Sequence, residues 1–208
     1  MKHYLRIICL FLLCFAISCG GNNEKKTTNT QKKSDSGGSK SKKIAPNSSN
    51  VTVGVASWEQ TLELVKKNKG KVVVVDVWST NCPPCMKEFP HLIELHHKYK
   101  DKGNVVCISV SLDNDGTLEG GAKNKELQEK VLEFLREQKA EIQNFICSET
   151  DEEFYTKQKP ELGAIPAVFV FAKDGTLKER FDDTDTKRLG GAFTYAKHIF
   201  PMVAELVK

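Results

Sequence analysis

Apolar and polar positions form a regular series of blocks from residue 57 onward. Two continuous apolar runs, at residues 72–78 and 105–111, are rich in valine and isoleucine and have the length of buried strands. The residues between them, 82–100, carry apolar side chains at helical spacing. Similar blocks continue to the C-terminus. The predicted helices cover residues 57–70, 82–100, 125–139, 152–159 and 195–207, and the predicted strands cover residues 72–78, 105–111, 144–147, 167–172 and 177–181.

These elements alternate between strand and helix, which is the pattern of an α/β protein. Strands that are apolar along their whole length are covered on both faces of the sheet. The turn sequence Lys173-Asp174-Gly175-Thr176 joins the last two strands as a hairpin. We therefore predict one α/β domain over residues 57–208, with a central mixed β-sheet flanked by helices.

The first 18 residues have the composition of an export signal. A short basic leader precedes an apolar stretch at residues 7–18, which is too short for an ordinary membrane span. The stretch ends in Ala16-Ile17-Ser18-Cys19-Gly20 and resembles a bacterial lipobox, although Ala16 stands where leucine is usual. The resemblance implies a lipoprotein-type signal peptide over residues 1–18 and a lipid on Cys19 that attaches the protein to a membrane. Ordinary signal cleavage and an uncleaved anchor are the alternatives.

Residues 19–56 are dominated by lysine, asparagine, serine, threonine and glycine. So few large apolar side chains cannot bury enough surface to offset the chain entropy, and we predict a disordered tether that begins with the lipidated Cys19. The formal net charge of +4 comes from the N-terminal part, because residues 57–208 contain slightly more acidic than basic residues. The folded domain shows no basic patch, and no nucleic-acid partner is predicted.

The most specific chemical pattern is Cys82-Pro83-Pro84-Cys85, which follows the strand at residues 72–78 and opens the next helix. Two cysteines at this spacing can exchange a disulfide with each other and with a partner protein. The exchange needs a thiolate. A helix N-terminus favours it, because unpaired N–H groups and the helix dipole attract negative charge. We predict a redox-active Cys82–Cys85 pair and no other cofactor.

Half of a zinc site is the alternative reading of this cysteine pair. A structural zinc site requires a second ligand pair, and Cys107 and Cys147 have no cysteine or histidine two to five residues away. No metal is therefore predicted. Cys107 and Cys147 lie in short apolar runs and are expected to be buried core thiols, or a second disulfide if their strands adjoin.

Several motifs, in the same order, resemble the thioredoxin superfamily and within it the exported TlpA/ResA-type proteins. They are Val75-Asp76-Val77-Trp78, Cys82-Pro83-Pro84-Cys85, Lys87-Glu88-Phe89-Pro90 and Gly163-Ala164-Ile165-Pro166. The resemblance covers roughly residues 57–181. It implies a thioredoxin-like fold with a helix-plus-strand insertion after the second core strand. It also implies a cis Pro166 whose neighbouring backbone faces the cysteine pair.

Position and chemistry assign roles to residues near the cysteine motif. Cys82 should be the exposed attacking thiolate, and Cys85, one turn deeper, should resolve the mixed disulfide. Asp76 lies within an apolar strand, where burial raises the pKa of a carboxyl group. It matches the buried acid of thioredoxins, which accepts the Cys85 proton; an aspartate turned to solvent is the alternative. Glu88 matches a glutamate of the TlpA/ResA branch and is a second acid/base candidate, or an ordinary exposed helical residue.

Substrate contacts are expected from Trp78, Ile165 and Pro166. Trp78 should pack beneath the cysteine motif and shape its surface, or serve the core alone. The backbone beside Pro166 can hydrogen-bond an extended substrate segment in the manner of strand addition. Asn81 departs from the family, which usually has tryptophan before the first cysteine. Ile165 is shared with thioredoxins, whereas many exported reductases carry threonine, and this favours a reducing activity.

The sequence therefore predicts an exported, lipid-anchored thiol–disulfide oxidoreductase of the bacterial cell envelope, in the periplasmic or extracytoplasmic space. Its expected reaction is the reduction of disulfides in exported proteins, with apocytochrome c as one substrate that the resemblance implies. Sustained reduction outside the cytoplasm implies a membrane electron donor as partner. Two alternatives stay open, namely a dithiol oxidase of the same fold and a lipoprotein whose thioredoxin-like domain only binds another protein.

Overall fold

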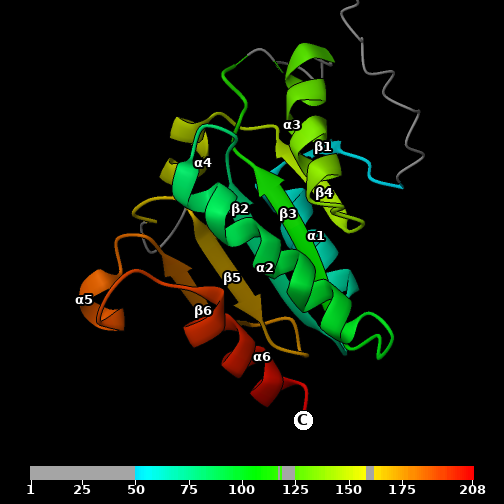
Figure 1. The fold of residues 1–208 in the computed structure, drawn as a ribbon, viewed down its shortest axis with the longest axis vertical. Helices are drawn as coiled ribbons and strands as arrows, with labels where there is room; N and C mark the ends of the chain where they lie inside the picture. Colours follow the sequence, from blue (N-terminus) through cyan, green and yellow to red (C-terminus); the bar gives the residue numbers. More distant parts are fainter. Residues whose placement is uncertain (1–49, 117, 119–124, 158–161) are drawn as a thin grey trace, which may run out of the picture. The chain divides into compact units, whose positions relative to one another are not determined.

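The structure is a computed structural model that describes residues 50–116, 118, 125–157 and 162–208. Its helices and strands follow each other along the chain in nearly the predicted order (Figure 1). The strands are β1 (Gly54–Ala56), β2 (Val72–Trp78), β3 (Val105–Ser111), β4 (Gln143–Cys147), β5 (Ala167–Phe171) and β6 (Leu177–Asp182). The α-helices are α1 (Trp58–Lys67), α2 (Pro83–Tyr99), α3 (Lys125–Glu137), α4 (Asp151–Lys157), α5 (Thr186–Leu189) and α6 (Phe200–Leu206), and a π-helical turn, Tyr195–Ile199, precedes α6.

All six strands form one mixed sheet in the order β1-β4-β3-β2-β5-β6. The first four of these strands are parallel to one another, while β5 pairs antiparallel with both β2 and β6. The long apolar runs form the centre of the sheet: every residue of β2 is at most 3% exposed. The predicted mixed sheet flanked by helices is confirmed.

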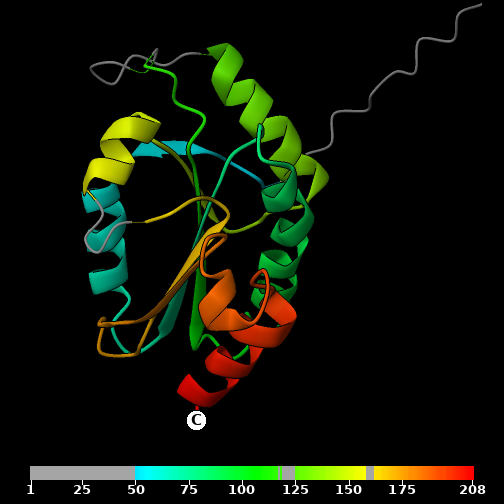
Figure 2. The same cartoon turned by 90° about the vertical axis from the view of Figure 1, so that its left-hand side faces the viewer.

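Helices cover both faces of the sheet, and Figure 2 shows the layers from the side. Side chains alternate between the two faces along a strand. In β2, Val72, Val74 and Trp78 join the apolar cluster that contains residues of α2, α3 and α6. Val73, Val75 and Val77 join the other cluster, with residues of α1 and α4. Asp76 has the parity of the first set, so it lies on the face covered by α2.

The helix-plus-strand insertion is also confirmed. Helix α3 and strand β4 follow β3 in the chain, and β4 lies between β1 and β3 in the sheet. Phe134 and Leu135 of α3 are buried in the same cluster as Phe89 of α2. The insertion therefore extends the sheet and also covers the face that carries the cysteine motif.

The start of the domain differs from the prediction. Residues 54–56, predicted to belong to the tether, form β1 and pair parallel with β4, and Val51 is only 4% exposed. A strand of three residues that starts with glycine is too short to show a hydrophobic period, which is why the sequence pattern did not reveal it. The predicted signal peptide, the lipidated Cys19 and most of the tether lie outside the described residues.

The C-terminal part also differs in detail. A helix with a bend at Pro201 was expected for residues 195–207; the structure has the π-helical turn followed directly by α6, with Pro201 in the first turn of α6. Proline suits that position because the amide N–H it lacks would have no partner there. Pro90 lies inside α2, and the helix continues on both sides of it. No helix in the described ranges is long and apolar enough to cross a membrane.

Candidate active site

The cysteine pair lies where β2 passes through a short loop into α2. Cys82 is the N-cap residue of α2, and its Sγ accepts a hydrogen bond from the amide N–H of Cys85 over 3.2 Å. The two cysteines form a disulfide, with their Cα atoms 5.3 Å apart. Cys82 is partly exposed, whereas Cys85 is 2% exposed. Cys82 is therefore the more accessible of the two cysteines, as expected of the residue that is predicted to attack.

The loop before Cys82 is held by Asp113, a residue that the sequence analysis did not single out. The Asp113 carboxylate accepts hydrogen bonds from the hydroxyls of Ser79, Thr80 and Ser111 and from the amide N–H of Thr80. Its side chain is 1% exposed. The available signal was its place just after β3, because the carboxyl ends of adjacent parallel strands meet at one edge of the sheet.

The insertion also reaches this loop. Lys130 of α3 donates to Asn81 Oδ1 over 3.0 Å, and its ammonium nitrogen lies 4.0 Å from Asp113 Oδ1. Asn81 occupies the position before the first cysteine where the family usually has tryptophan. The contact between Lys130 and Asn81 replaces an apolar rim with a polar one.

A pocket of about 390 Å³ opens beside Cys82. Ile165 lines it, and the Ile165–Pro166 peptide bond is cis, as the family resemblance implied. The structure thus brings Ile165 and Cys82 together from distant parts of the chain. Three carboxylates, those of Asp113, Asp115 and Asp151, also line the pocket. The surroundings of the reactive sulfur are therefore polar and acidic on one side.

Asp76 is buried, with 3% exposure, and it receives a hydrogen bond from the phenol of Tyr195. The pKa of Asp76 is raised from 3.8 to about 7; burial raises it most, the Tyr195 hydrogen bond lowers it, and the charge of Glu88 raises it further. The alternative of an aspartate turned to solvent is wrong. A carboxyl group with a pKa of about 7 exists in both protonation states at neutral pH, as a group that takes up and releases a proton must.

Glu88 lies three residues after Cys85 on α2 and is half-buried. Its Oε2 accepts a hydrogen bond from the backbone N–H of Tyr195 over 3.2 Å. Glu88 is therefore a partner of a residue distant in the chain and not an ordinary exposed helical residue. Tyr195 links the two predicted acids, and sequence reasoning missed it, because an aromatic residue at the start of a C-terminal helix signals only core packing.

Trp78 is fully buried and packs between two aromatic rings. Its ring centroid lies 4.9 Å from that of Phe89 on α2 and 4.8 Å from that of Phe134 on α3. This is the predicted packing beneath the cysteine motif, and it leaves no exposed surface of Trp78 for a substrate. Cys107 and Cys147 are free and buried, so a second disulfide between them is absent from this part of the structure.

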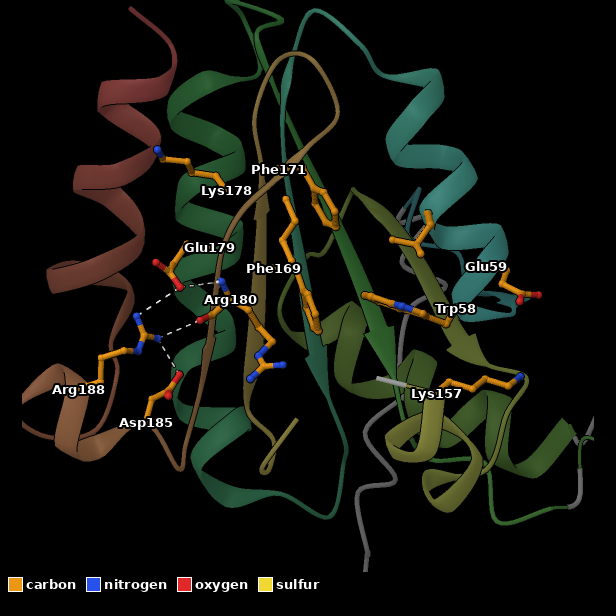
Figure 3. A pocket seen from close by; sticks show the side chains of 12 residues that line it. Trp58, Glu59, Lys157, Phe169, Phe171, Lys178, Glu179, Arg180, Asp185 and Arg188 are labelled. Atoms are coloured by element: carbon orange, nitrogen blue, oxygen red, sulfur yellow. Dashed lines mark hydrogen bonds and ion pairs between the residues drawn. The ribbon is translucent and has the colours of Figure 1, made fainter. Parts of the chain in front are cut away.

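A larger pocket, of about 930 Å³, lies elsewhere on the domain (Figure 3). Its floor includes Trp58 of α1 and Phe169 of β5, whose ring centroids are 4.8 Å apart. At the edge of this pocket, the guanidinium group of Arg188 forms ion pairs with Glu179 and Asp185. None of the residues that line it belongs to the cysteine motif, and its floor is formed on the α1 face of the sheet. It is separate from the redox centre.

The fold and the site together define a class of protein. A mixed sheet whose central strand leads to a disulfide at a helix N-terminus, with a cis-proline loop beside the exposed sulfur, is a thioredoxin-like arrangement. The profile of the Redoxin family matches residues 40–194, well over half of the chain. The protein belongs to the Redoxin family.

Two sets of known proteins resemble the chain. Thiol-disulfide oxidoreductase ResA of a Bacillus cereus strain is 32% identical over 123 residues, which cover 59% of this chain and 61% of the relative. Thiol-disulfide oxidoreductase ResA of Bacillus anthracis is 45% identical over 53 residues, 26% of this chain and 29% of the relative. The chain therefore spans less than two thirds of these relatives. A secreted Mycobacterium tuberculosis disulfide oxidoreductase of known structure, homologous to E. coli DsbE, is 17% identical with a TM-score of 0.48, covering 67% of this chain and 85% of that one.

Proposed function

We propose that the protein is a thiol–disulfide oxidoreductase that reduces disulfides of other proteins through Cys82 and Cys85. The observation that carries the proposal is the position of the pair: Cys82 is accessible at the N-terminus of α2, and Cys85 is buried one turn deeper. Unpaired N–H groups and the dipole of α2 stabilise a thiolate on Cys82. The names of the ResA relatives support the same reaction class.

The reaction is an exchange of sulfur bonds that moves two electrons. The Cys82 thiolate attacks one sulfur of the substrate disulfide, so the substrate S–S bond breaks, a mixed disulfide forms and the leaving thiolate takes a proton. Cys85 then loses its proton to the Asp76 carboxylate and attacks the Cys82 sulfur. This step forms the Cys82–Cys85 disulfide, releases the substrate's second thiolate and leaves the enzyme oxidised. Glu88 contacts Tyr195 next to Asp76 and is the second acid/base candidate.

The direction of electron flow and the location complete the proposal. Ile165 before the cis proline favours a reductant, and substrate backbone is proposed to pair with the chain beside Pro166. We place the enzyme outside the cytoplasm, held to a membrane by a lipid on Cys19, with disulfide-containing exported proteins, among them apocytochrome c, as substrates. A membrane electron donor must then restore the dithiol. A dithiol oxidase and a non-catalytic binding protein are the competing functions.

Two measurements separate these functions. The equilibrium reduction potential of the Cys82–Cys85 pair should be about −270 mV for a reductant, and a value of about −120 mV would instead show that the protein is an oxidase. In a turnover assay with dithiothreitol and insulin, the wild type should be active and Cys82→Ser inactive. Equal inactivity of both proteins with every donor and substrate tried would leave only the binding function.

The anchor has its own test, which is independent of the chemistry. Growing cells supplied with labelled palmitate should incorporate the label into the full chain, and a Cys19→Ala variant should lose it. Label that persists in Cys19→Ala would refute lipidation at this residue, while leaving the redox proposal unaffected.

A further inference from the structure

The C-terminal segment delivers one residue to the middle of the redox site. Tyr195 is fully buried, 119 positions away from Asp76 in the chain, and its phenol donates a hydrogen bond to the Asp76 carboxylate. Its backbone N–H donates to Glu88 Oε2 over 3.2 Å. One residue therefore contacts both acids, with its side chain on one and its main chain on the other.

The backbone around Tyr195 fixes this position. Tyr195 opens the π-helical turn, and the Thr194 side chain caps that turn by accepting from the amide N–H of Lys197 over 3.3 Å. The amide N–H of Thr194 in turn donates to His198 Nδ1 over 3.0 Å. Single π-helical turns are frequent at functional sites. Here the turn directs the phenol toward β2.

The surroundings of Asp76 explain why its carboxylate needs the hydrogen bond from Tyr195. Glu88 approaches Asp76 from α2, Cys107 from β3 and Tyr195 from the C-terminal segment. The facing residue of β5 is Val168, which carries no charge. A buried carboxylate with an acid and an apolar strand beside it is costly unless a donor compensates. The phenol of Tyr195 is that donor.

We propose that Tyr195 is a positioning residue for the exchange reaction, whose phenol holds the Asp76 carboxylate in its ionised, proton-accepting form while its amide N–H holds Glu88. The inference rests on the proposed function, in which Asp76 receives the Cys85 proton. Tyr195 itself transfers no proton. Burial and the charge of Asp76 raise the pKa of Tyr195 well above its ordinary value, so the phenol stays a donor at every working pH.

Tyr195→Phe tests the inference, because it removes the phenol oxygen and keeps both the ring and the amide N–H that holds Glu88. The reduced enzyme is mixed with an aromatic disulfide that releases one coloured thiolate on attack by Cys82 and a second on attack by Cys85. The rate of the second release, followed against pH, reports the activation of Cys85. In the wild type this rate should fall below about pH 7, where Asp76 becomes protonated.

Loss of a hydrogen bond to the ionised carboxylate favours the protonated form of Asp76. The rate of the second release should therefore begin to fall at a pH about one unit higher in Tyr195→Phe than in the wild type. The second release should then be about tenfold slower on the acid side and unchanged well above both midpoints. Tyr99→Phe is the matched control, since Tyr99 is another buried tyrosine whose ring contacts Lys98 and Lys102, and its profile should equal that of the wild type.

The Asp76→Asn background identifies the group through which Tyr195 acts. His91 lies against the Tyr195 ring, with ring centroids 6.3 Å apart, so it is another ionisable group through which Tyr195 could act. If Tyr195 acts on Asp76, then Asp76→Asn and the double variant should have the same profile. A shift that persists in the double variant would refute the inference and assign the effect to another group.

The remaining outcomes distinguish the inference from the proposed function. A wild-type profile in Tyr195→Phe, together with an altered one in Asp76→Asn, would refute the positioning role and leave the proposed proton transfer intact. A wild-type profile in Asp76→Asn would refute the proton transfer itself. If Tyr195→Phe does not fold, 3-fluorotyrosine at position 195 replaces it; as a stronger donor, it should move the fall to lower pH, and an unmoved profile would overturn the inference.

Discussion

Replacement of the buried acid should make the protein increasingly stable relative to the wild type as the pH rises. Burial raises the pKa of Asp76 from 3.8 to about 7. A group with a raised folded-state pKa binds its proton more tightly in the folded chain. The protonated group therefore stabilises the folded state fully below the pKa that it has in the unfolded chain. This stabilisation is lost as the pH rises through the pKa that it has in the folded chain. Asp76→Asn removes this ionisation, so the variant should not share the loss.

The magnitude follows from the interval between the two pKa values. At about 1.36 kcal/mol per pH unit, the interval from 3.8 to about 7 corresponds to about 4 kcal/mol lost at alkaline pH. At about pH 5 only the first part of this interval has been crossed, and the loss is roughly 1–2 kcal/mol. The free energy of unfolding of Asp76→Asn, minus that of the wild type, should thus grow by about 3 kcal/mol between about pH 5 and about pH 8.5.

Urea unfolding of the oxidised proteins at both pH values measures this difference. Constant effects of the asparagine side chain cancel, since only the change with pH is compared. Glu88→Gln is a second variant: the charge of Glu88 contributes to the raised pKa of Asp76, so the same comparison in that background should give a smaller change with pH. A difference that stays constant within about 1 kcal/mol would show that Asp76 ionises at its ordinary pKa and would refute the reasoning.

Three further predictions concern the cysteine pair and its supports. Cys85→Ala should trap partner proteins as mixed disulfides on Cys82, recoverable by affinity capture and released by dithiothreitol; absence of any adduct would contradict the division of roles. Asp113→Ala leaves buried hydroxyl and amide donors without an acceptor, so denaturant unfolding should show a loss of about 2 kcal/mol or more, whereas an unchanged stability would mean that the loop does not depend on it. Gly163→Ala would bring its new Cβ into contact with the Thr184 hydroxyl, and its turnover should fall; an unchanged turnover would show that the loop before the cis proline yields without effect on the site.

Local signals were sufficient for the parts of the site that are local in sequence. Residues 72–85 contain an apolar strand, one acid within it and a cysteine pair at the start of a helix, and each of these features has its own pattern. The contact of Tyr195 with Asp76 joins residues 119 positions apart. No periodicity records such a contact, because it depends on how the C-terminal segment packs against α2.

Two features, a very short strand and a single residue after a strand, gave too little local pattern to be predicted. Strand β1 has three residues and an exposed glycine, so it becomes recognisable only through its pairing with β4. Asp113 follows a strand, and that position alone does not separate a binding residue from a loop anchor. Its hydrogen bonds to Ser79 and Thr80 depend on the adjacency of β2 and β3, which a single sequence does not fix.

The raised pKa of Asp76 constrains the chemistry without fixing its direction. A carboxyl group with a pKa of about 7 can accept a proton from Cys85 when the dithiol is oxidised and can return it when the disulfide is reduced. Reductases and oxidases both need that reversibility, so the roles proposed for Asp76 and Tyr195 are compatible with either function. The direction depends instead on how strongly the N-terminus of α2 and the acidic pocket beside Cys82 stabilise or oppose the thiolate form. The α2 dipole favours the thiolate, whereas the carboxylates of Asp113, Asp115 and Asp151 oppose it. A net opposition would lower the reduction potential and make the pair a reductant, and the measured potential decides between the two effects.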